Sequence, residues 1–410
     1  MADPARFPWR PMIGLGAAAE VLFLNGLARD PRPYFDETHY VPAARTLLAL
    51  TGPVNIEHPL FAKELIAAGI LLFGDNAWGW RVPMTLCGAA TVIAIFAIGW
   101  QLWREVRPAI VGALIALTGF TLFVEARLAM LDGPMAALAL AAIAVLLAAV
   151  HARNAGRYVA LAGALFGLGV AAKWAALPWF GLAGLALGAA TLRPRGLFGG
   201  LGPITAGALF AAPAVLAYFI TFAPAFFYAD QPLTLATLIP FQADIYAEQT
   251  LPMPSHPYQS NWWSWPLDLR PIWYLYEPVD GVERGVLMLG NPAVMWGGLI
   301  GLGYGLIEGA RRRAWPLLAP VALWAGAYLP WIIIPKKIGF FYYYYGASLC
   351  LPLAIAGMAH ALDPDGRRRL GWIAVAVSTA LFLWFYPILS AAALEGPDAF
   401  LRWMWLASWP

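Results

Sequence analysis

The sequence predicts an all-helical protein that crosses a membrane many times. Of its 410 residues, 61% are hydrophobic and 12% are charged. A soluble fold could not hide that much apolar surface, because a surface in water also needs polar side chains. Apolar stretches of about 18–22 residues recur along the chain, and each can cross a bilayer core of about 30 Å. These observations predict one polytopic domain over residues 1–410.

About eleven transmembrane helices are expected. The first apolar run has no clear small-residue cleavage site, so we expect a retained helix there. The segments that begin near 108, 158 and 174 are short, and their ends are approximate. In chain order, the expected spans are 11–28, 82–101, 108–123, 134–150, 158–172, 174–190, 197–222, 287–307, 314–334, 339–361 and 370–390.

The arginines predict the orientation of these spans. With a cytoplasmic N-terminus, every short loop on the cytoplasmic side carries arginine, which satisfies the positive-inside rule. The opposite side then holds two long external loops, 29–81 and 223–286. We therefore expect an integral membrane protein with a cytoplasmic N-terminus and both long loops on the outer side. The cytoplasmic arginines are Arg6, Arg10, Arg104, Arg107, Arg153, Arg157, Arg193, Arg195, Arg311, Arg312, Arg313, Arg367, Arg368 and Arg369.

The lysines follow the opposite distribution. All four lie at or near the expected outer membrane boundary, on the side that the topology disfavours. Snorkelling at a helix end can explain a single lysine. Four together favour an anionic ligand held at the outer surface. They are Lys63, Lys173, Lys336 and Lys337.

The first external loop concentrates ionisable side chains. Its segment FDETHY places Asp36 and Glu37 at an expected helix start, where an acidic residue is also an ordinary N-cap. His58 and the proline after it form an extended dipeptide. The amphipathic segment that follows carries Lys63 and is expected to lie along the membrane surface. The loop ends with Arg81 at the mouth of the second span.

The next external turn, VEARLAMLDGP, crowds Glu125, Arg127 and Asp132 between two apolar helices. Its simplest interpretation is a buried salt bridge of Arg127 with one of the two carboxylates. The second long loop contains His256 and Arg270 among many Trp, Tyr and Pro residues. Such aromatic density is typical of an interfacial belt, and it also suits stacking on sugars or packing on lipid chains.

Carboxylates, cations and aromatic side chains beside lipid suit the transfer of a group from a phospholipid carrier. A carboxylate among cations can act as a base near neutral pH, and clustered Lys and Arg can hold a phosphate leaving group. The sequence has no P-loop and no GxGxxG after a strand, so we do not expect an ATP-driven pump. The expected partners are the lipid-linked donor, the acceptor and membrane lipids, with no nucleic acid. A phospholipid transporter would predict an internal repeat and polar residues deep in several spans. Glu20 is the main charge inside a span.

Several short motifs follow one another over most of the chain. They are FDETHY (35–40), EHPLFAKELIA (57–67), WGWRVP (78–83), EARLAMLDGP (125–134), AAKWAALPW (171–179), SHPYQSNWWSW with RPI (255–272), GNPAVMW (290–296) and FYYYYGA (341–347). In this order they resemble the dolichyl- or polyprenyl-phosphate-mannose protein O-mannosyltransferases and their bacterial relatives. These enzymes belong to the GT-C superfamily of lipid-carrier glycosyltransferases.

The resemblance implies a GT-C-type bundle with an external catalytic pocket and a sugar on a polyprenyl phosphate as donor. The Asp-Glu signature of the family maps onto Asp36 and Glu37. Asp36 would be the general base toward the acceptor hydroxyl, and Glu37 would position the acceptor or the base. One displacement would invert the anomeric carbon. The donor phosphodiester would release polyprenyl phosphate, a weak base, so the leaving group would need charge stabilisation and no general acid.

The resemblance also implies which residues bind the substrates. Asp132 would orient an arginine or contact the sugar. No metal would be required, although a divalent ion at the acidic and histidine side chains of loop one stays open, because their spacing fits no strong ligand pattern. The donor phosphate would be held by some of Lys63, Arg81, Arg127, Lys173, Lys336 and Lys337, and His58, His256, Arg270 and Tyr345 complete the expected substrate-binding residues.

Two departures from the family pattern concern the acceptor. A second proline after His58 is often present in the family, whereas Leu60 follows Pro59 here, and loop 223–286 is too short for the large soluble insert of the eukaryotic enzymes. The first expectation is transfer of mannose to Ser or Thr of secreted proteins. The alternative is modification of a lipid or glycan, as in aminoarabinose transfer to lipid A. A non-catalytic assembly subunit would tolerate loss of Asp36.

Overall fold

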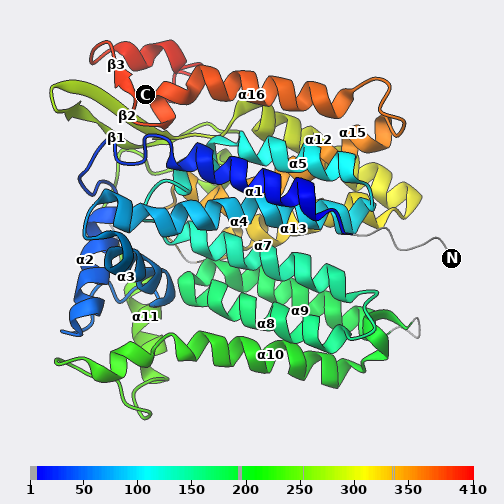
Figure 1. Ribbon diagram of the computed structural model, residues 1–410, viewed down its shortest axis with the longest axis horizontal. Coiled ribbons are helices and arrows are strands. Elements are labelled where there is room, and N and C mark those ends of the chain that lie inside the picture. The colour runs from blue at the N-terminus through cyan, green and yellow to red at the C-terminus, as the bar shows by residue number, and fades with distance from the viewer. Residues whose placement is uncertain (1–6, 193–195, 253, 335, 337) are drawn as a thin grey trace.

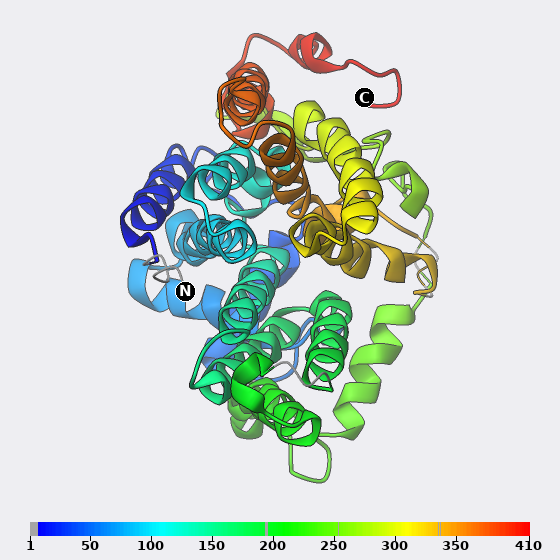
Figure 2. The same ribbon diagram turned by 90° about the vertical axis from the view of Figure 1, so that its right-hand side faces the viewer.

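The computed structural model describes residues 7–192, 196–252, 254–334, 336 and 338–410. Long helices run side by side along one direction, and their connections gather at the two ends of the bundle (Figures 1 and 2). The predicted class, a helical membrane protein, is confirmed, with the addition of one small sheet. The helices are α1 (Trp9–Leu24), α2 (Glu37–Ala49), α3 (Phe61–Phe73), α4 (Ala77–Trp103), α5 (Val106–Leu117), α6 (Phe120–Glu125), α7 (Asp132–Ala149), α8 (Ala155–Ala172), α9 (Leu177–Thr191), α10 (Pro203–Ile220), α11 (Pro240–Thr250), α12 (Pro292–Arg312), α13 (Trp315–Tyr328), α14 (Tyr345–Ser348), α15 (Leu351–Leu362) and α16 (Leu370–Leu389).

Among the described residues, eight helical segments are long and apolar enough to cross a membrane. A ninth span results if Phe341–Ser348 and Leu351–Leu362, which are bent by 40°, count as one. Each of the other two expected spans also contains a helix, but α1 has 16 residues and α5 has 12. The expected number of eleven spans is therefore not established. The eight segments are Ala77–Trp103, Asp132–Ala149, Ala155–Ala172, Trp174–Thr191, Pro203–Phe227, Pro292–Arg312, Trp315–Ile332 and Leu370–Leu389.

The two ends of the bundle differ in structure. The short arginine-bearing connections α4–α5, α7–α8, α12–α13 and α15–α16 lie at the same end as the N-terminus (Figure 1). The opposite end carries α2, α3 and α11, and α2 and α3 lie across the ends of the long helices. An amphipathic helix in this orientation suits a membrane surface. The non-spanning elements, which include the candidate site, thus share one end.

A small antiparallel sheet, of order β1–β2–β3, lies at the same end as α2 and α3 (Figure 1). Its strands are β1 (Ile272–Val279), β2 (Val282–Met288) and β3 (Ala393–Leu394). The all-helical prediction did not include them, because the aromatic residues of this loop were interpreted as an interfacial belt. Asp280 and Gly281 form the hairpin turn with φ of 53° and 77°. An Asp-Gly pair is a strong hairpin signal, so the sequence did contain the information.

Helices α8 and α10 contact each other through their backbones. A Cβ atom on Gly163 would lie 2.1 Å from the carbonyl oxygen of Phe210, and one on Gly167 would lie 2.1 Å from that of Ala214. Two glycines four residues apart on one face allow this approach, as in other membrane helix pairs. The contact fixes α8, which ends immediately before Lys173.

Candidate functional site

The predicted site residues converge at the end of the bundle that carries α2 and α3. Asp36 immediately precedes α2, Asp132 begins α7, and Lys173 follows α8. The segment Phe341–Tyr344, a 3₁₀ turn, brings the tyrosine run to the same place. Residues far apart in the sequence therefore surround one small region.

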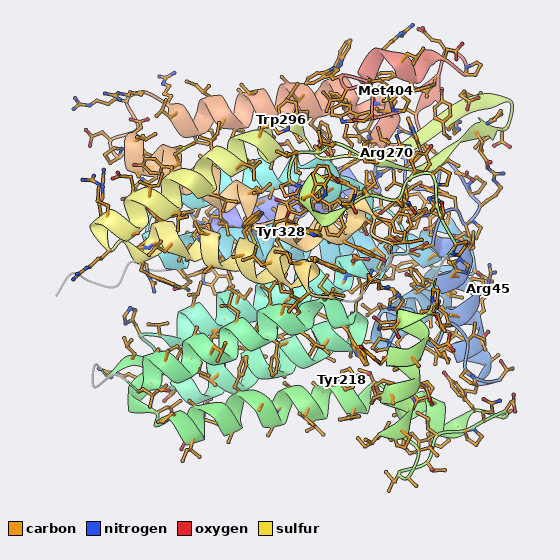
Figure 3. The ribbon with its side chains drawn as sticks, turned by 180° about the vertical axis from the view of Figure 1, so that it is seen from behind. Arg45, Tyr218, Arg270, Trp296, Tyr328 and Met404 are labelled. Atoms are coloured by element: carbon orange, nitrogen blue, oxygen red, sulfur yellow. The ribbon has the colours of Figure 1, made fainter. Side chains whose placement is uncertain are left out.

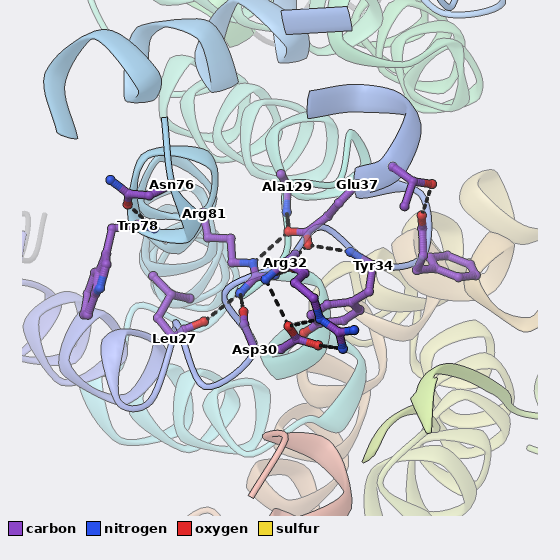
Figure 4. Close-up of polar contacts among 11 residues, drawn as sticks. Leu27, Asp30, Arg32, Tyr34, Glu37, Asn76, Trp78, Arg81 and Ala129 are labelled. Atoms are coloured by element: carbon purple, nitrogen blue, oxygen red, sulfur yellow. Dashed lines mark hydrogen bonds and ion pairs between the residues drawn. The ribbon is translucent and has the colours of Figure 1, made fainter. Parts of the chain in front are cut away.

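Glu37 and Arg81 form a buried ion pair (Figure 4). Arg81 Nε donates to Glu37 Oε1 at 2.8 Å, and Arg81 Nη2 donates to Oε2 at 2.7 Å. The backbone N–H of Ala129 also donates to Glu37 Oε1, at 2.8 Å. The Glu37 side chain is completely buried. Its carboxylate thus joins α2 to α4 and to the turn before α7.

The other N–H groups of Arg81 hold the start of loop one. Nη1 donates to the carbonyl oxygens of Leu27 and Asp30, at 3.0 and 2.7 Å, and Nη2 donates to that of Arg32 at 2.9 Å. A guanidinium has five N–H groups, and each has a protein acceptor here. Phosphate binding by Arg81 stays a prediction, and in this arrangement Arg81 has no N–H group left for a phosphate.

Asp36, in contrast, has few partners. It occupies the N-cap position of α2, yet its side chain makes no capping hydrogen bond. Its Oδ2 accepts one long hydrogen bond, from Tyr40 Oη at 3.4 Å. Burial raises the pKa of the Asp36 carboxyl, while Lys173 and His39 lower that pKa and the Asp132 carboxylate raises it. Asp36 therefore lies near Lys173 and Asp132 with its oxygens available.

Phe35 sets the backbone direction into Asp36. Its φ of 53° lies in the left-handed region, which is uncommon for a bulky residue. The Phe35 ring stacks on Tyr274, with 3.8 Å between centroids, and Tyr274 Oη donates to Glu125 Oε1 at 2.7 Å. Strained residues of this kind cluster at functional sites. No pattern in the sequence gives Phe35 or Tyr274 a role, because their rings meet from segments far apart in the chain. Tyr40 lies one helical turn after Asp36, and this spacing could have indicated its contact.

Asp132 pairs with Lys173, and the two atoms Asp132 Oδ2 and Lys173 Nζ are 2.6 Å apart. Burial disfavours the Lys173 ammonium, but the Asp132 carboxylate outweighs this effect and raises the Lys173 pKa. The predicted salt bridge between Arg127 and one of the two carboxylates is therefore wrong, because Asp132 pairs with Lys173 instead. Arg127 instead donates to the carbonyl oxygens of Phe23, Asn25 and Gly26 at the end of α1.

Lys63, His58 and Lys336 lie around the same region. Lys63 Nζ donates to the carbonyl oxygens of Asn55 and His58, and burial lowers its pKa to about 7. Burial and the charges of Lys173, Lys63 and Lys336 lower the pKa of His58. Lys336 Nζ lies 5.6 Å from the Tyr343 ring centroid. Within the part of the chain that the structure describes, Lys336 has no ion-pair partner.

The remaining predicted residues are more scattered. Arg270 Nη1 donates to the carbonyl oxygen of Ser408 at 2.8 Å, so it holds the C-terminal segment (Figure 3). His256 is exposed, and its ring lies 5.3 Å from that of Phe340. Tyr345 is buried, and its hydroxyl has no hydrogen-bond partner among the described residues. Lys337 lies outside the described residues.

Two family models match the chain. "Dolichyl-phosphate-mannose-protein mannosyltransferase" matches residues 57–219, and "C-terminal four TMM region of protein-O-mannosyltransferase" matches residues 234–409. The chain belongs to the protein O-mannosyltransferase family. The resemblance predicted from the motifs is thereby confirmed, and so is the enzyme class, a glycosyltransferase.

Relatives in this family match nearly the whole chain. The polyprenol-phosphate-mannose–protein mannosyltransferase of Mycolicibacterium smegmatis is 28% identical, over 96% of this chain and 91% of the relative. The protein of the same description from Mycobacterium tuberculosis is 27% identical, over 96% and 90%. A shorter match, 30% identical over 24% of this chain, is to an undecaprenyl phosphate-aminoarabinose arabinosyl transferase of Pseudomonas fluorescens.

Solved structures establish the fold of the family member described here. A chain of the S. cerevisiae protein O-mannosyltransferase complex bound to the sugar donor has a TM-score of 0.84, with 14% identity, and the match covers 98% of this chain and 92% of that one. ArnT from Cupriavidus metallidurans has a TM-score of 0.60, with 19% identity over 95% and 67%. The predicted GT-C-type bundle is confirmed.

The site of this glycosyltransferase contains two neighbouring carboxylates that differ in their number of hydrogen-bond donors. Glu37 is saturated by Arg81 and Ala129, whereas Asp36 keeps its oxygens available beside a lysine. Such an arrangement can remove a proton from a hydroxyl and stabilise an anionic leaving group nearby. Across the described ranges, no three His, Cys, Asp or Glu side chains group as ligands for a metal ion.

Proposed function

We propose that this protein transfers mannose from a polyprenyl-phosphate donor to Ser or Thr hydroxyls of secreted proteins. The mycobacterial relatives that match nearly the whole chain are polyprenol-phosphate-mannose–protein mannosyltransferases, which supports this donor and a protein acceptor. The observation that carries the proposal to this chain is the contrast between saturated Glu37 and available Asp36, with Lys173 beside it. The reaction takes place at the periplasmic face of a bacterial inner membrane, with the N-terminus in the cytoplasm.

In the proposed reaction, Asp36 accepts the proton of the acceptor hydroxyl. The hydroxyl oxygen forms a bond to the anomeric carbon as the bond from that carbon to the phosphate oxygen breaks. The electron pair leaves with the polyprenyl phosphate, and the configuration at the anomeric carbon inverts. Glu37 and Arg81 position Asp36 by holding the start of α2. The phosphate is a weak base, so this step requires neither a general acid nor a metal, and EDTA should not reduce the rate.

Lys336 is the proposed contact to the leaving phosphate, because it has no carboxylate partner among the described residues, whereas Lys63 and Lys173 are engaged. Lys336→Gln should lower kcat/KM for the donor about 10- to 100-fold, as expected for loss of one hydrogen bond to a charged group. The measurement is initial rate against donor concentration. Lys336→Arg keeps the charge and should retain most of the activity, and equal losses in both variants would contradict the assignment.

The pH profile tests whether Asp36 is the base. Asp36 must be ionised to accept a proton, so its pKa sets the acid limb of kcat/KM. Lys173→Gln removes a positive charge, should raise the Asp36 pKa, and should move the acid limb to higher pH. Asp132→Asn removes a negative charge and should move the limb to lower pH. Only variants that elute as folded protein in gel filtration are compared. If the acid limbs of both variants move in the same direction, Lys173 and Asp132 do not act on the Asp36 pKa as proposed.

The acceptor is tested with purified protein in nanodiscs and radiolabelled polyprenyl-phosphate mannose. A Ser/Thr-rich peptide and a lipid acceptor are offered in parallel, with and without EDTA. Label in the peptide supports protein O-mannosyl transfer. Label in the lipid alone would replace it with the lipid-modifying alternative, to which the short P. fluorescens match corresponds.

A further inference from the structure

A cleft of about 390 Å³ lies between loop one and the second external loop. Its volume falls within the range typical of ligand sites. Loop one contributes Val54 and Leu60, the segment before α11 contributes Leu233, and α11 contributes Phe241. These residues make much of the lining apolar. The charged residues of the cleft are concentrated on one side of it.

The His58 side of the cleft lies near Tyr40 and Asp36. His58 is part of its lining, and the buried His58 Nδ1 atom has no hydrogen-bond partner among the described residues. The His58 ring lies 6.0 Å from the ring of Tyr40, whose hydroxyl contacts Asp36. The cleft thus lies next to the candidate site, with the side chains of His58 and Tyr40 between the cleft and Asp36.

Two carboxylates lie on the α11 side of the cleft. Asp244 and Glu248 are one helical turn apart on α11, and both are exposed. Over the described ranges, neither forms an ion pair. Like charges at this spacing are mildly destabilising in a helix. They leave this part of the cleft negative, whereas lysines surround its His58 end.

We propose that this cleft binds the acceptor polypeptide and that Asp244 and Glu248 select acceptors with Lys or Arg near the modified hydroxyl. This inference rests on the proposed function. A lysine or arginine suits the cleft, because its aliphatic stem can cover Phe241 and Val54 while its charge meets the carboxylates. The polyprenyl phosphate suits the cleft less well. Its phosphate would be repelled by Asp244 and Glu248, and its apolar chain would gain nothing from the two carboxylates.

The wall that carries the carboxylates is tied to the catalytic region. Tyr218 Oη donates to Gln242 Oε1 on α11 at 2.6 Å, and Trp174 Nε1 donates to Tyr218 Oη at 3.0 Å. Trp174 directly follows Lys173 in the chain. Tyr218 lies at the end of α10 next to α11 (Figure 3). The helix that carries the two carboxylates is therefore linked through Tyr218 to the residue that follows Lys173.

Three peptides test the inference, each with a single Thr flanked by two Lys, two Gln or two Glu residues. The wild type should modify the Lys peptide with a kcat/KM about 3- to 10-fold above the Gln peptide, and the Glu peptide should be slowest. The preference should shrink at high salt. The double variant Asp244→Asn, Glu248→Gln should lose the preference, so that its kcat/KM no longer ranks the Lys peptide above the Gln and Glu peptides.

A matched control removes two carboxylates elsewhere at the same end of the molecule, by Asp280→Asn with Asp398→Asn. This variant should keep the preference, because neither residue lines the cleft. Equal modification of all three peptides by the wild type would leave the proposed function standing and overturn the inference. So would an unchanged preference in the Asp244, Glu248 double variant.

A second readout does not depend on transfer. A Lys peptide with Ala in place of Thr and a benzophenone side chain should crosslink to residues 225–248, as mapped by mass spectrometry, and the double variant should lower the yield. If this crosslink forms while no peptide accepts mannose, the cleft assignment holds and the proposed acceptor is wrong. A photoreactive polyprenyl phosphate that labels α11 where the peptide does not would overturn the cleft assignment.

Discussion

Asparagine in place of Asp36 should lower kcat for mannosyl transfer about 10²- to 10⁴-fold, the usual contribution of a general base. The variant should fold normally, because the Asp36 carboxylate forms no ion pair within the described residues and only one long hydrogen bond. Transfer of label from polyprenyl-phosphate mannose to peptide measures the rate. Gel filtration and a melting curve of the same preparation measure the fold.

The control for this variant is Asp280→Asn, which removes a carboxylate in the hairpin turn and should leave the rate unchanged. An Asp36→Asn protein as active as the wild type would remove Asp36 from the mechanism, whatever the acceptor. It would also reopen the non-catalytic assembly role, which tolerates loss of this residue.

Arg81→Gln should destabilise the protein by about 3–5 kcal/mol, the range for breaking a buried ion pair on one side. The variant leaves the fully buried Glu37 carboxylate without its cation, and three backbone carbonyls lose their donor. The expected observation is a large drop in the melting temperature and in the yield of monodisperse protein.

Arg45→Gln is the matched control for Arg81→Gln. Arg45 also pairs with an acidic residue, Asp75, but about 43% of the Arg45 side chain and 45% of the Asp75 side chain are exposed. Its loss should cost about 1 kcal/mol or less. Similar melting temperatures for the two variants would show that the Glu37–Arg81 pair does not hold loop one.

Much of the fold could be predicted from the sequence, because transmembrane helices depend on local runs of apolar residues. Each expected span contains a helix, and the ordered motifs identified the family. The hairpin was not predicted, although Asp280-Gly281 indicates it, because the density of aromatic residues around it is also typical of an interfacial belt. The number of spans was harder to predict because α5 and α6 are separate short helices in the region of one expected span.

The candidate site was predictable as a set of residues and less so as a set of roles. Glu37 and Arg81 are 44 positions apart, and neither residue type indicates that its partner will saturate it. Arg127 looked like a partner for a nearby carboxylate, yet it donates to carbonyls about 100 positions earlier. Sequence spacing shows which charges exist near a boundary, whereas tertiary packing determines which of them remain available for a substrate.

The backbone contact between α8 and α10 has a consequence for which acceptor sites are used. At Gly163 and Gly167 the backbones of α8 and α10 are in direct contact. A shift of one helix therefore moves the other helix with it. One helix leads to Lys173, and the other holds α11 through Tyr218. The distance between Lys173, which lies near the proposed base Asp36, and the carboxylates of Asp244 and Glu248 is then fixed. In a proteome-wide map, the modified Ser or Thr should stand at one recurrent spacing from a basic residue.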